Sequence, residues 1–319
     1  MQTGTPPMDS SLHGSCPNES TWEVNIEELI AATKEYQDLC DSRHFYENIR
    51  GFPFTPKVLP PGVTRLWVKP HVGGPTLRAE ADTQDYVHTE INKRGPPTSQ
   101  GLYVPKVFDY AEFEIDGFIH SCIVMEFVTG TPISSIMKPT LWSRDMSESA
   151  KNQIVRPFKD RVANALCFLL SLSPLPDTAP APVNGGRIKN FVFGRDNCDG
   201  PCDFDTLEQL QEWINQENEK EKLNPDLTTA DLVSEGLKLC YCDINFDNFL
   251  LENPDDPASR LTMIDFEHTA WLPFSFLIWA LWDKREVYIV EQVTSQTGME
   301  IPRGNTEALH NLHLQRRWL

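Results

Sequence analysis

The spacing of apolar residues divides the chain into two parts of different character. In the first part, alternating apolar and polar residues predict strands at 63–69, 104–115 and 118–127. The last two strands meet at Asp116-Gly117, a pair that favours a two-residue hairpin turn. A helix is expected to begin at Thr76 and to run to about residue 91. The pattern therefore predicts a small antiparallel sheet with one helix.

The segments before this sheet are expected to add one further helix. Residues 1–20 are rich in Pro, Ser and Gly and are predicted to form a loose tail. Residues 25–40 carry an apolar stripe at helical spacing, and Asn25 is a suitable residue to cap this helix. Residues 51–62 contain four prolines, which favours an irregular connection.

After Gly130 the spacing becomes mainly helical. Long helical patterns predict three helices, at residues 147–172, 204–218 and 274–290. Short apolar runs predict three strands, at residues 237–242, 249–252 and 261–265. The expected fold class is α+β, with a small N-terminal antiparallel sheet plus helix and a larger, mainly helical C-terminal lobe. The corresponding division is a tail and helix at 1–50, a first lobe at 51–128 and a second lobe at 129–319.

The charge of the chain argues against two classes of partner. There are 28 Lys and Arg residues and 46 Asp and Glu residues, so the formal net charge is −18. Nucleic acids and anionic membrane surfaces both require a basic face, so neither is expected to bind. An anionic small ligand is not excluded, because a bound metal or a single lysine can reverse the local field. The oligomeric state is not readable from the sequence.

No feature of the sequence indicates export or insertion into a membrane. Residues 1–20 have neither a basic start nor an apolar run. The most apolar stretch, 271–282, is shorter than the roughly 20 residues that a membrane span needs. The eight cysteines are scattered, which is typical of a reduced cytoplasmic protein. Cys240 and Cys242 have a poor spacing for zinc, so a zinc site shared with Cys198 and Cys202 is not expected.

The most informative chemistry lies at the ends of two predicted strands. An apolar strand leads into Asp243, Asn248 follows five residues later, and a later strand ends at Asp265-Phe266-Glu267. Oxygen ligands at adjacent strand ends suit Mg²⁺, and a further carboxylate in the same loop can take the proton of a hydroxyl group. Asp and Asn are also common turn residues, so either one alone would indicate only a loop. Together they predict the components of phosphoryl transfer.

The segment 239–251 resembles the His-Gly-Asp-x-x-x-x-Asn loop of the aminoglycoside phosphotransferase and choline kinase family, which has a two-lobe protein-kinase-like fold. It looks most like the large fungal branch of that family. Further segments resemble family motifs in the same order: the lysine strand at 66–69, a helix at 80–87, a strand at 104–110, the hinge at 123–130, Gly200-Pro201 before the helix of Trp213, and the block 264–273. The resemblance covers about residues 60–290.

The resemblance implies a role for the matching residues. Asp243 would be the catalytic base, and Asn248 and Asp265 would be ligands of Mg²⁺. Lys69 would hold the α- and β-phosphates of ATP and pair with Glu80. The alternative for Lys69 is a solvated strand end, and for Glu80 a solvated helix face.

The resemblance also implies a hinge between the lobes at Glu126 and Val128, where backbone groups hydrogen-bond adenine. Met125 and Phe127 are expected to line the core or the adenine pocket. His268, close to Asp265, is expected to pack or to hydrogen-bond rather than to bind metal.

The activity implied is an ATP- and Mg²⁺-dependent transfer of the γ-phosphoryl group to a hydroxyl of a small molecule whose identity is not readable.

Three features depart from the family pattern. Tyr241-Cys242 replaces His-Gly, the segment 59–62 offers one glycine in place of a glycine-rich loop, and the C-terminal lobe is expected to be shortened because only 52 residues follow Glu267. These departures keep open a second hypothesis, a kinase-fold pseudoenzyme that senses nucleotide or binds a protein partner. A protein kinase is a third, less favoured reading.

Overall fold

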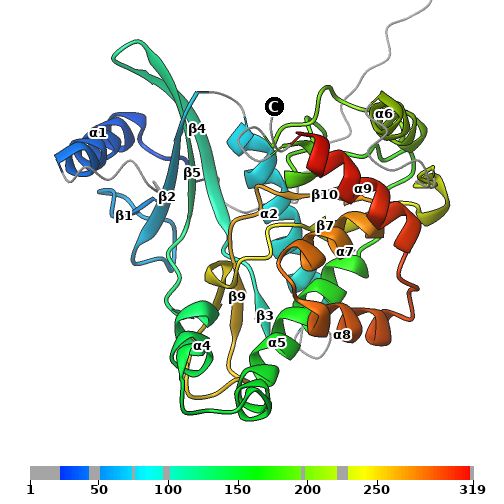
Figure 1. The fold of residues 1–319 in the computed structure, drawn as a ribbon. Coiled ribbons are helices and arrows are strands. Elements are labelled where there is room, and N and C mark those ends of the chain that lie inside the picture. The colour runs from blue at the N-terminus through cyan, green and yellow to red at the C-terminus, as the bar shows by residue number, and fades with distance from the viewer. Residues whose placement is uncertain are drawn as a thin grey trace, which may run out of the picture.

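The computed structural model describes residues 22–42, 51–73, 76–95, 101–194, 198–220 and 229–316. The tail expected at residues 1–20 lies outside this range. In Figure 1 the sheet of the first part stands beside the helical second part, with α2 (Thr76–Arg94) between them.

Four antiparallel strands form the sheet of the first part, in the order β1-β2-β5-β4. They are β1 (Phe52–Phe54), β2 (Leu66–Val72), β4 (Val107–Ile115) and β5 (Phe118–Glu126). The hairpin turn expected between β4 and β5 is confirmed. Asp116 and Gly117 both have positive φ, at 53° and 84°, as a type I′ turn requires.

The ends of these strands correct the expectations from sequence. Residues 51–62 are not irregular throughout, because β1 pairs with β2 despite Pro53. An edge strand tolerates proline because one of its sides needs no hydrogen-bond donor. Strand β2 begins later than expected, at Leu66, and β4 begins at Val107. The short β3 (Leu102–Tyr103) that precedes β4 belongs to another sheet.

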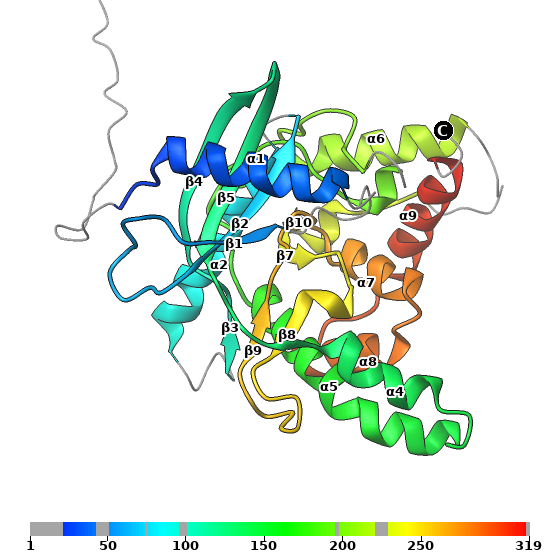
Figure 2. The ribbon, with the colours of Figure 1, turned by 90° about the vertical axis from the view of Figure 1, so that its left-hand side faces the viewer.

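Helices cover both faces of the four-stranded sheet. The side-chain oxygen of Asn25 accepts a backbone hydrogen bond from the first turn of α1 (Ile26–Ser42), so the expected cap is confirmed. Leu29 of α1 shares a buried cluster with Val124 of β5, and α1 lies across the sheet in Figure 2. Leu77 of α2 shares another cluster with Ile123. Neighbouring residues of β5 thus face opposite helices.

The packing of α1 on the sheet predicts unequal effects of two leucine substitutions in that helix. Leu29 is fully buried, whereas Leu39 is 49% exposed. We expect Leu29→Ala to lower the free energy of unfolding by about 2–4 kcal/mol, because it leaves a cavity. Leu39→Ala is expected to cost less than about 1 kcal/mol. Urea denaturation measures both, and equal losses would contradict the packing of α1 against the sheet.

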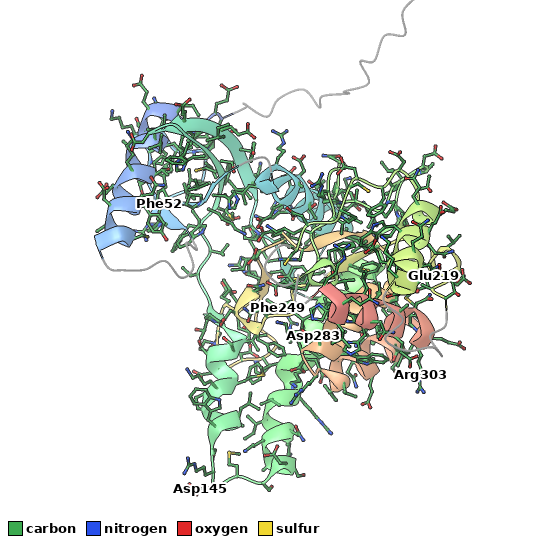
Figure 3. The ribbon with its side chains drawn as sticks, turned by 45° about the horizontal axis from the view of Figure 1, so that its top comes forward. Phe52, Asp145, Glu219, Phe249, Asp283 and Arg303 are labelled. Carbon is green, nitrogen blue, oxygen red and sulfur yellow. The ribbon has the colours of Figure 1, made fainter. Side chains whose placement is uncertain are left out.

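Helices dominate the second part of the chain. They are α4 (Ile133–Trp142), α5 (Glu148–Leu170), α6 (Leu207–Lys220), α7 (Phe274–Asp283), α8 (Val287–Thr297) and α9 (Arg303–Arg316). The single helix expected at 274–290 is wrong, because Arg285 has a φ of 60° and separates α7 from α8. Helices α4 and α9 were not predicted. Asp145 marks the end of the projecting α4–α5 hairpin in Figure 3.

Short strands hold the loops of the second part together. They form a sheet of order β3-β9-β8-β6 and the antiparallel pair β7 and β10. The bounds are β6 (Thr131–Pro132), β7 (Lys238–Tyr241), β8 (Phe249–Leu251), β9 (Leu261–Met263) and β10 (Thr269–Leu272). A Cβ atom on Gly130 would lie 2.9 Å from Cβ of Leu250 and 3.1 Å from the carbonyl oxygen of Leu251. A glycine there lets the segment after β5 approach β8.

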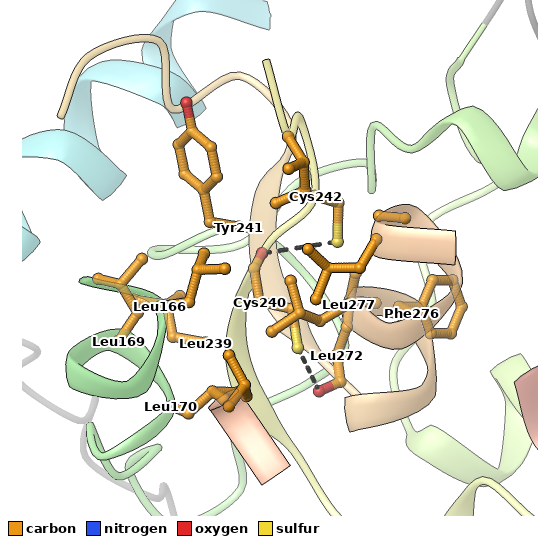
Figure 4. Close-up of a cluster of buried hydrophobic side chains, with 14 of the residues drawn as sticks. Leu166, Leu169, Leu170, Leu239, Cys240, Tyr241, Cys242, Leu272, Phe276 and Leu277 are labelled. Carbon is orange, nitrogen blue, oxygen red and sulfur yellow. Dashed lines mark hydrogen bonds between the residues drawn. The ribbon is translucent and has the colours of Figure 1, made fainter. Parts of the chain in front are cut away.

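Strand β7 runs through the largest buried cluster of the molecule. Leu239 lies beside Leu166 of α5, whereas Cys240 and Cys242 lie on the side of Leu277 of α7 (Figure 4). The two cysteines therefore share one side, as their spacing predicts. Burial raises the pKa of the Cys242 thiol to about 12, so it stays protonated.

The expected fold class is confirmed. The chain is α+β, with a small antiparallel sheet and its helix in the first part and a larger, mainly helical second part. Within the described ranges, no helix is both long and apolar enough to cross a bilayer. The domain boundaries at residues 50 and 128 stay predictions.

Candidate active site

Three charged side chains from distant segments meet in a partly buried ion-pair cluster, here called the Lys69 cluster. Lys69 comes from β2, Glu80 from α2 and Asp265 from the segment after β9. The Nζ atom of Lys69 lies 2.8 Å from both carboxylate oxygens of Glu80 and 2.7 Å from Oδ1 of Asp265. Glu80 is only 2% exposed. The structure thus brings together three of the residues selected from the sequence.

Local geometry explains why Lys69 and Glu80 face one another. Leu66 and Val68 of β2 are buried on the side of α1, so the alternation of the strand turns Lys69 toward α2. On α2, Glu80 lies three residues after the buried Leu77 and therefore shares its face. Lys69 of β2 and Glu80 of α2 therefore meet between the strand and the helix.

The charges in the Lys69 cluster depend on one another. Burial lowers the pKa of Lys69, but the carboxylates of Glu80, Asp265 and Glu267 raise it by more, so the net shift is upward. Burial raises the pKa of Glu80, and Lys69 offsets only part of that shift. An ion pair removed from water persists only where both partners are held in place.

A second pair of selected residues meets in the loop after β7. The side-chain nitrogen of Asn248 donates to Oδ2 of Asp243 at 3.0 Å. The backbone N–H of Ile264 donates to the carbonyl oxygen of Asn248 at 3.0 Å, which ties this loop to the strand leading to Asp265. Burial raises the pKa of Asp243, although His268 acts in the opposite direction. The Asp243 loop and the Lys69 cluster are therefore parts of one site.

The residues that replace His-Gly before Asp243 fit the loop well. The hydroxyl of Tyr241 donates to the carbonyl oxygen of Ile264 at 2.8 Å, and its ring packs edge-on against Phe249 and Phe266. Cys242 has no positive φ, so its Cβ causes no strain there. The tyrosine braces the loop against the segment that carries Asp265.

Asp265 itself has an unusual backbone conformation. Its φ is 65°, in the left-handed region that residues other than glycine rarely adopt. Such a conformation costs free energy and tends to occur where a side chain must be aimed at a function. Here it accompanies a carboxylate that contacts Lys69 from another segment.

The two residues expected at the hinge lie at and just after the end of β5. The carboxylate of Glu126 accepts a hydrogen bond from the hydroxyl of Tyr103, and its backbone N–H donates to Lys106 at 2.9 Å. Among the described residues, neither Glu126 nor Val128 hydrogen-bonds with the Lys69 cluster or with Asp243. Glu126 is the last residue of β5 and pairs with Leu66 of β2, the strand of Lys69, and Val128 lies two residues further on.

The structure adds a lysine that sequence reasoning missed. Lys189 forms an ion pair with Glu267, two residues beyond Asp265. Burial raises the pKa of Glu267, but Lys69 and Lys189 lower it by more. Burial and the charge of Lys189 also lower the pKa of His71. No motif surrounds Lys189, so only its position in space identifies it.

Loss of the lysine from the Lys69 cluster is expected to be costly. Lys69→Met leaves the buried Glu80 without its partner, and we expect a loss of about 3–5 kcal/mol in the free energy of unfolding at neutral pH. The matched control is Lys93→Met, which removes the exposed pair with Glu90 on the same helix as Glu80. Urea denaturation should show a nearly unchanged midpoint for the control; similar effects of both variants would contradict a buried ion pair.

The bracing role of Tyr241 predicts a smaller, specific effect. Tyr241→Phe leaves the carbonyl of Ile264 without its donor, and should lower the free energy of unfolding by about 1–3 kcal/mol. Tyr86→Phe is the control, because the Tyr86 hydroxyl makes no hydrogen bond within the described residues, although its ring packs on Trp271. Thermal and urea unfolding of both variants measure the difference. A neutral Tyr241→Phe would show that the hydroxyl does not hold the loop.

Comparisons with known proteins give similarity in structure only. No family model matches the sequence, and no curated protein matches it significantly. The solved structure of the GDP complex of wild-type aminoglycoside 2'-phosphotransferase-IIIa is 14% identical, covers 88% of this chain and 87% of its own, and has a TM-score of 0.43. The microcompartment-associated aminopropanol kinase is 11% identical, with coverages of 88% and 86% and a TM-score of 0.43. An aminoglycoside phosphotransferase from Alicyclobacillus acidocaldarius is 11% identical, with coverages of 84% and 78% and a TM-score of 0.35. At these identities the likeness concerns the fold alone, and the function must be argued from the residues of this chain.

Proposed function

We propose that this chain is an ATP- and Mg²⁺-dependent phosphotransferase that moves the γ-phosphoryl group to a hydroxyl of a small molecule. The observation that carries the proposal is the junction of the Lys69 cluster with the Asp243 loop. A buried lysine held by Glu80, a carboxylate at Asp265 and a carboxylate–amide pair at Asp243 and Asn248 are the groups that phosphoryl transfer needs.

The donor set at Asn248 and Asp265 fits a magnesium ion. The amide nitrogen of Asn248 is used by Asp243, which leaves its amide oxygen for another partner. Asp265 accepts from Lys69 through Oδ1, and its Oδ2 makes no hydrogen bond within the described residues. Amide and carboxylate oxygens are the ligands that Mg²⁺ prefers, usually in small number and together with substrate phosphates. When bound, the ion would neutralise charge on the transferring phosphoryl group.

The chain's own residues would position the nucleotide and the acceptor. Lys69, oriented by Glu80, would bind the α- and β-phosphates. Backbone groups of Glu126 and Val128 would hydrogen-bond adenine. Asp243 would accept the proton of the acceptor hydroxyl. The hydroxyl oxygen would then form its bond to the γ-phosphorus as the bond from that phosphorus to ADP breaks. The raised pKa of Asp243 makes it a stronger base than an aspartate in water.

The second candidate is a kinase-fold pseudoenzyme, and one feature favours it. The segment before β2 offers only Gly62 at the position of a glycine-rich loop, so fewer backbone N–H groups are available to bind phosphates. We retain the enzyme as the first candidate because all three of Asp243, Asn248 and Asp265 are present. The fungal branch of the family and a cytoplasmic location remain proposals with it.

Nucleotide binding and turnover separate the two candidates. Thermal unfolding with ATP or GTP, in Mg²⁺ or in EDTA, should show stabilisation only with nucleotide and Mg²⁺ together. ADP or GDP release with a metabolite panel should then reveal turnover. We expect Asp243→Asn to lower turnover at least about 100-fold while keeping the nucleotide-dependent stabilisation. Asp265→Asn should lose both.

A control in the same loop tests whether the effect is specific. Asp247 hydrogen-bonds to Ser134 of α4, and Asp247→Asn should keep most of the turnover. No stabilisation at millimolar nucleotide would exclude the enzyme. Stabilisation with slow hydrolysis that Asp243→Asn leaves unchanged would favour the pseudoenzyme.

A further inference from the structure

A cation and two rings lie together on one side of the Asp243 loop. The rings of Phe191 and His268 are stacked, with centroids 4.4 Å apart and an interplanar angle of 13°. The Nζ atom of Lys284 lies 5.6 Å from the centroid of Phe191. These three residues, here called the Phe191 cluster, come from separate segments: η1 (Phe191–Phe193), the turn before β10, and the end of α7.

Backbone hydrogen bonds fix the Phe191 cluster relative to the catalytic loop. The carbonyl oxygen of His268 accepts from the N–H of Cys242, the residue before Asp243, at 3.0 Å. The carbonyl oxygen of Phe191 accepts from Nδ1 of His313 in α9 at 2.8 Å. The cluster is therefore held on two sides, by the catalytic loop and by the last described helix.

The environment changes from buried to exposed across this cluster. His268 is 7% exposed, and its Nδ1 atom is buried without a hydrogen-bond partner among the described residues. Burial lowers the pKa of His268, so the ring is mostly uncharged at neutral pH. Phe191 is half-buried, and Lys284 is exposed at the break between α7 and α8. Lys284 is thus the exposed cationic side chain of the cluster.

Lys284 differs from the other lysines near the site in lacking a carboxylate partner. Lys69 pairs with Glu80 and Lys189 with Glu267. Within the described residues, Lys284 forms no ion pair. Lys284 contacts Phe191, which stacks on His268, and the carbonyl of His268 is joined to the residue before Asp243, so in a chain with a net charge of −18 this lysine offers a positive charge to an anion on this side of the loop.

We propose that the Phe191 cluster is the acceptor subsite and that the acceptor is a small hydroxylated compound bearing an oxyanion, either a carboxylate or a phosphate ester. The ammonium group of Lys284 would pair with the oxyanion, and Phe191 would pack against the carbon skeleton. The hydroxyl would then reach Asp243. The inference rests on the proposed phosphotransferase function and adds the class of its acceptor.

The test compares acceptors that share a carbon skeleton and differ in charge. ADP release in Mg²⁺-ATP is measured with gluconate, glucose 6-phosphate, sorbitol and glucosamine, and then with larger panels of the same four classes. We expect one of the two anionic classes to have a kcat/KM at least about 10-fold above the neutral and cationic classes. The comparison of gluconate with glucose 6-phosphate separates a carboxylate from a phosphate ester.

Substitution of the lysine assigns the preference to this site. Lys284→Gln should raise the KM of the anionic acceptor at least about 10-fold, with little change in kcat or in the KM of ATP. Lys138→Gln is the matched control. Lys138 is also exposed, but it belongs to α4, and its Nζ atom lies 4.5 Å from the centroid of the Trp142 ring. The control should retain the kinetics of the unmodified chain.

Each outcome decides the inference. A preference for sorbitol or glucosamine, or an unchanged KM in Lys284→Gln, would overturn the inference and leave the phosphotransferase proposal standing. A second result would also overturn the inference alone: Mg²⁺-ATP stabilises the protein, but the anionic panels give neither turnover nor thermal stabilisation. Failure of Mg²⁺-ATP itself to stabilise the protein would remove the proposed function and the inference together.

Discussion

The structure depends on the buried contact of one lysine with two carboxylates. Lys69, Glu80 and Asp265 come from β2, α2 and the segment after β9, which lie in different parts of the chain. Glu80 is buried and Lys69 is largely so, and burying such charges is unfavourable unless each is compensated, so the contact requires all three elements to be in place. The Lys69 cluster therefore joins the four-stranded sheet to the helical part at the position where the proposed chemistry occurs.

A second constraint acts on the loop that carries Asp243. The ring of Tyr241 packs against Phe266, and its hydroxyl donates a hydrogen bond to the carbonyl oxygen of Ile264, the residue before Asp265. These contacts join the loop to the segment of Asp265. A histidine at this position would provide a smaller ring. The bracing contact is made to the backbone of Ile264, next to Asp265. Tyrosine therefore holds the Asp243 loop against the segment of Asp265.

The parts of the structure that sequence predicted are those set by local patterns. The Asp116-Gly117 turn and the cap at Asn25 follow from residue type and spacing. The pairing of Lys69 with Glu80 was expected only from the family resemblance, and the other contacts between distant segments were not predicted. Lys189 reaches Glu267 only through the fold, and the break at Arg285 follows from a backbone angle that apolar spacing does not reveal. The same break leaves Lys284 exposed at the end of α7.

The central claim is that a metal–nucleotide complex binds between Lys69, Asn248 and Asp265. The most direct test is methionine-methyl NMR with Mn²⁺ in place of Mg²⁺, since the paramagnetic ion broadens nearby signals. Met263 lies two residues before Asp265, whereas Met299 follows α8. The account predicts that Mn²⁺-ATP broadens Met263 far more than Met299, and that Asp265→Asn abolishes the effect. Equal broadening of both methyls, or none at all, would contradict it.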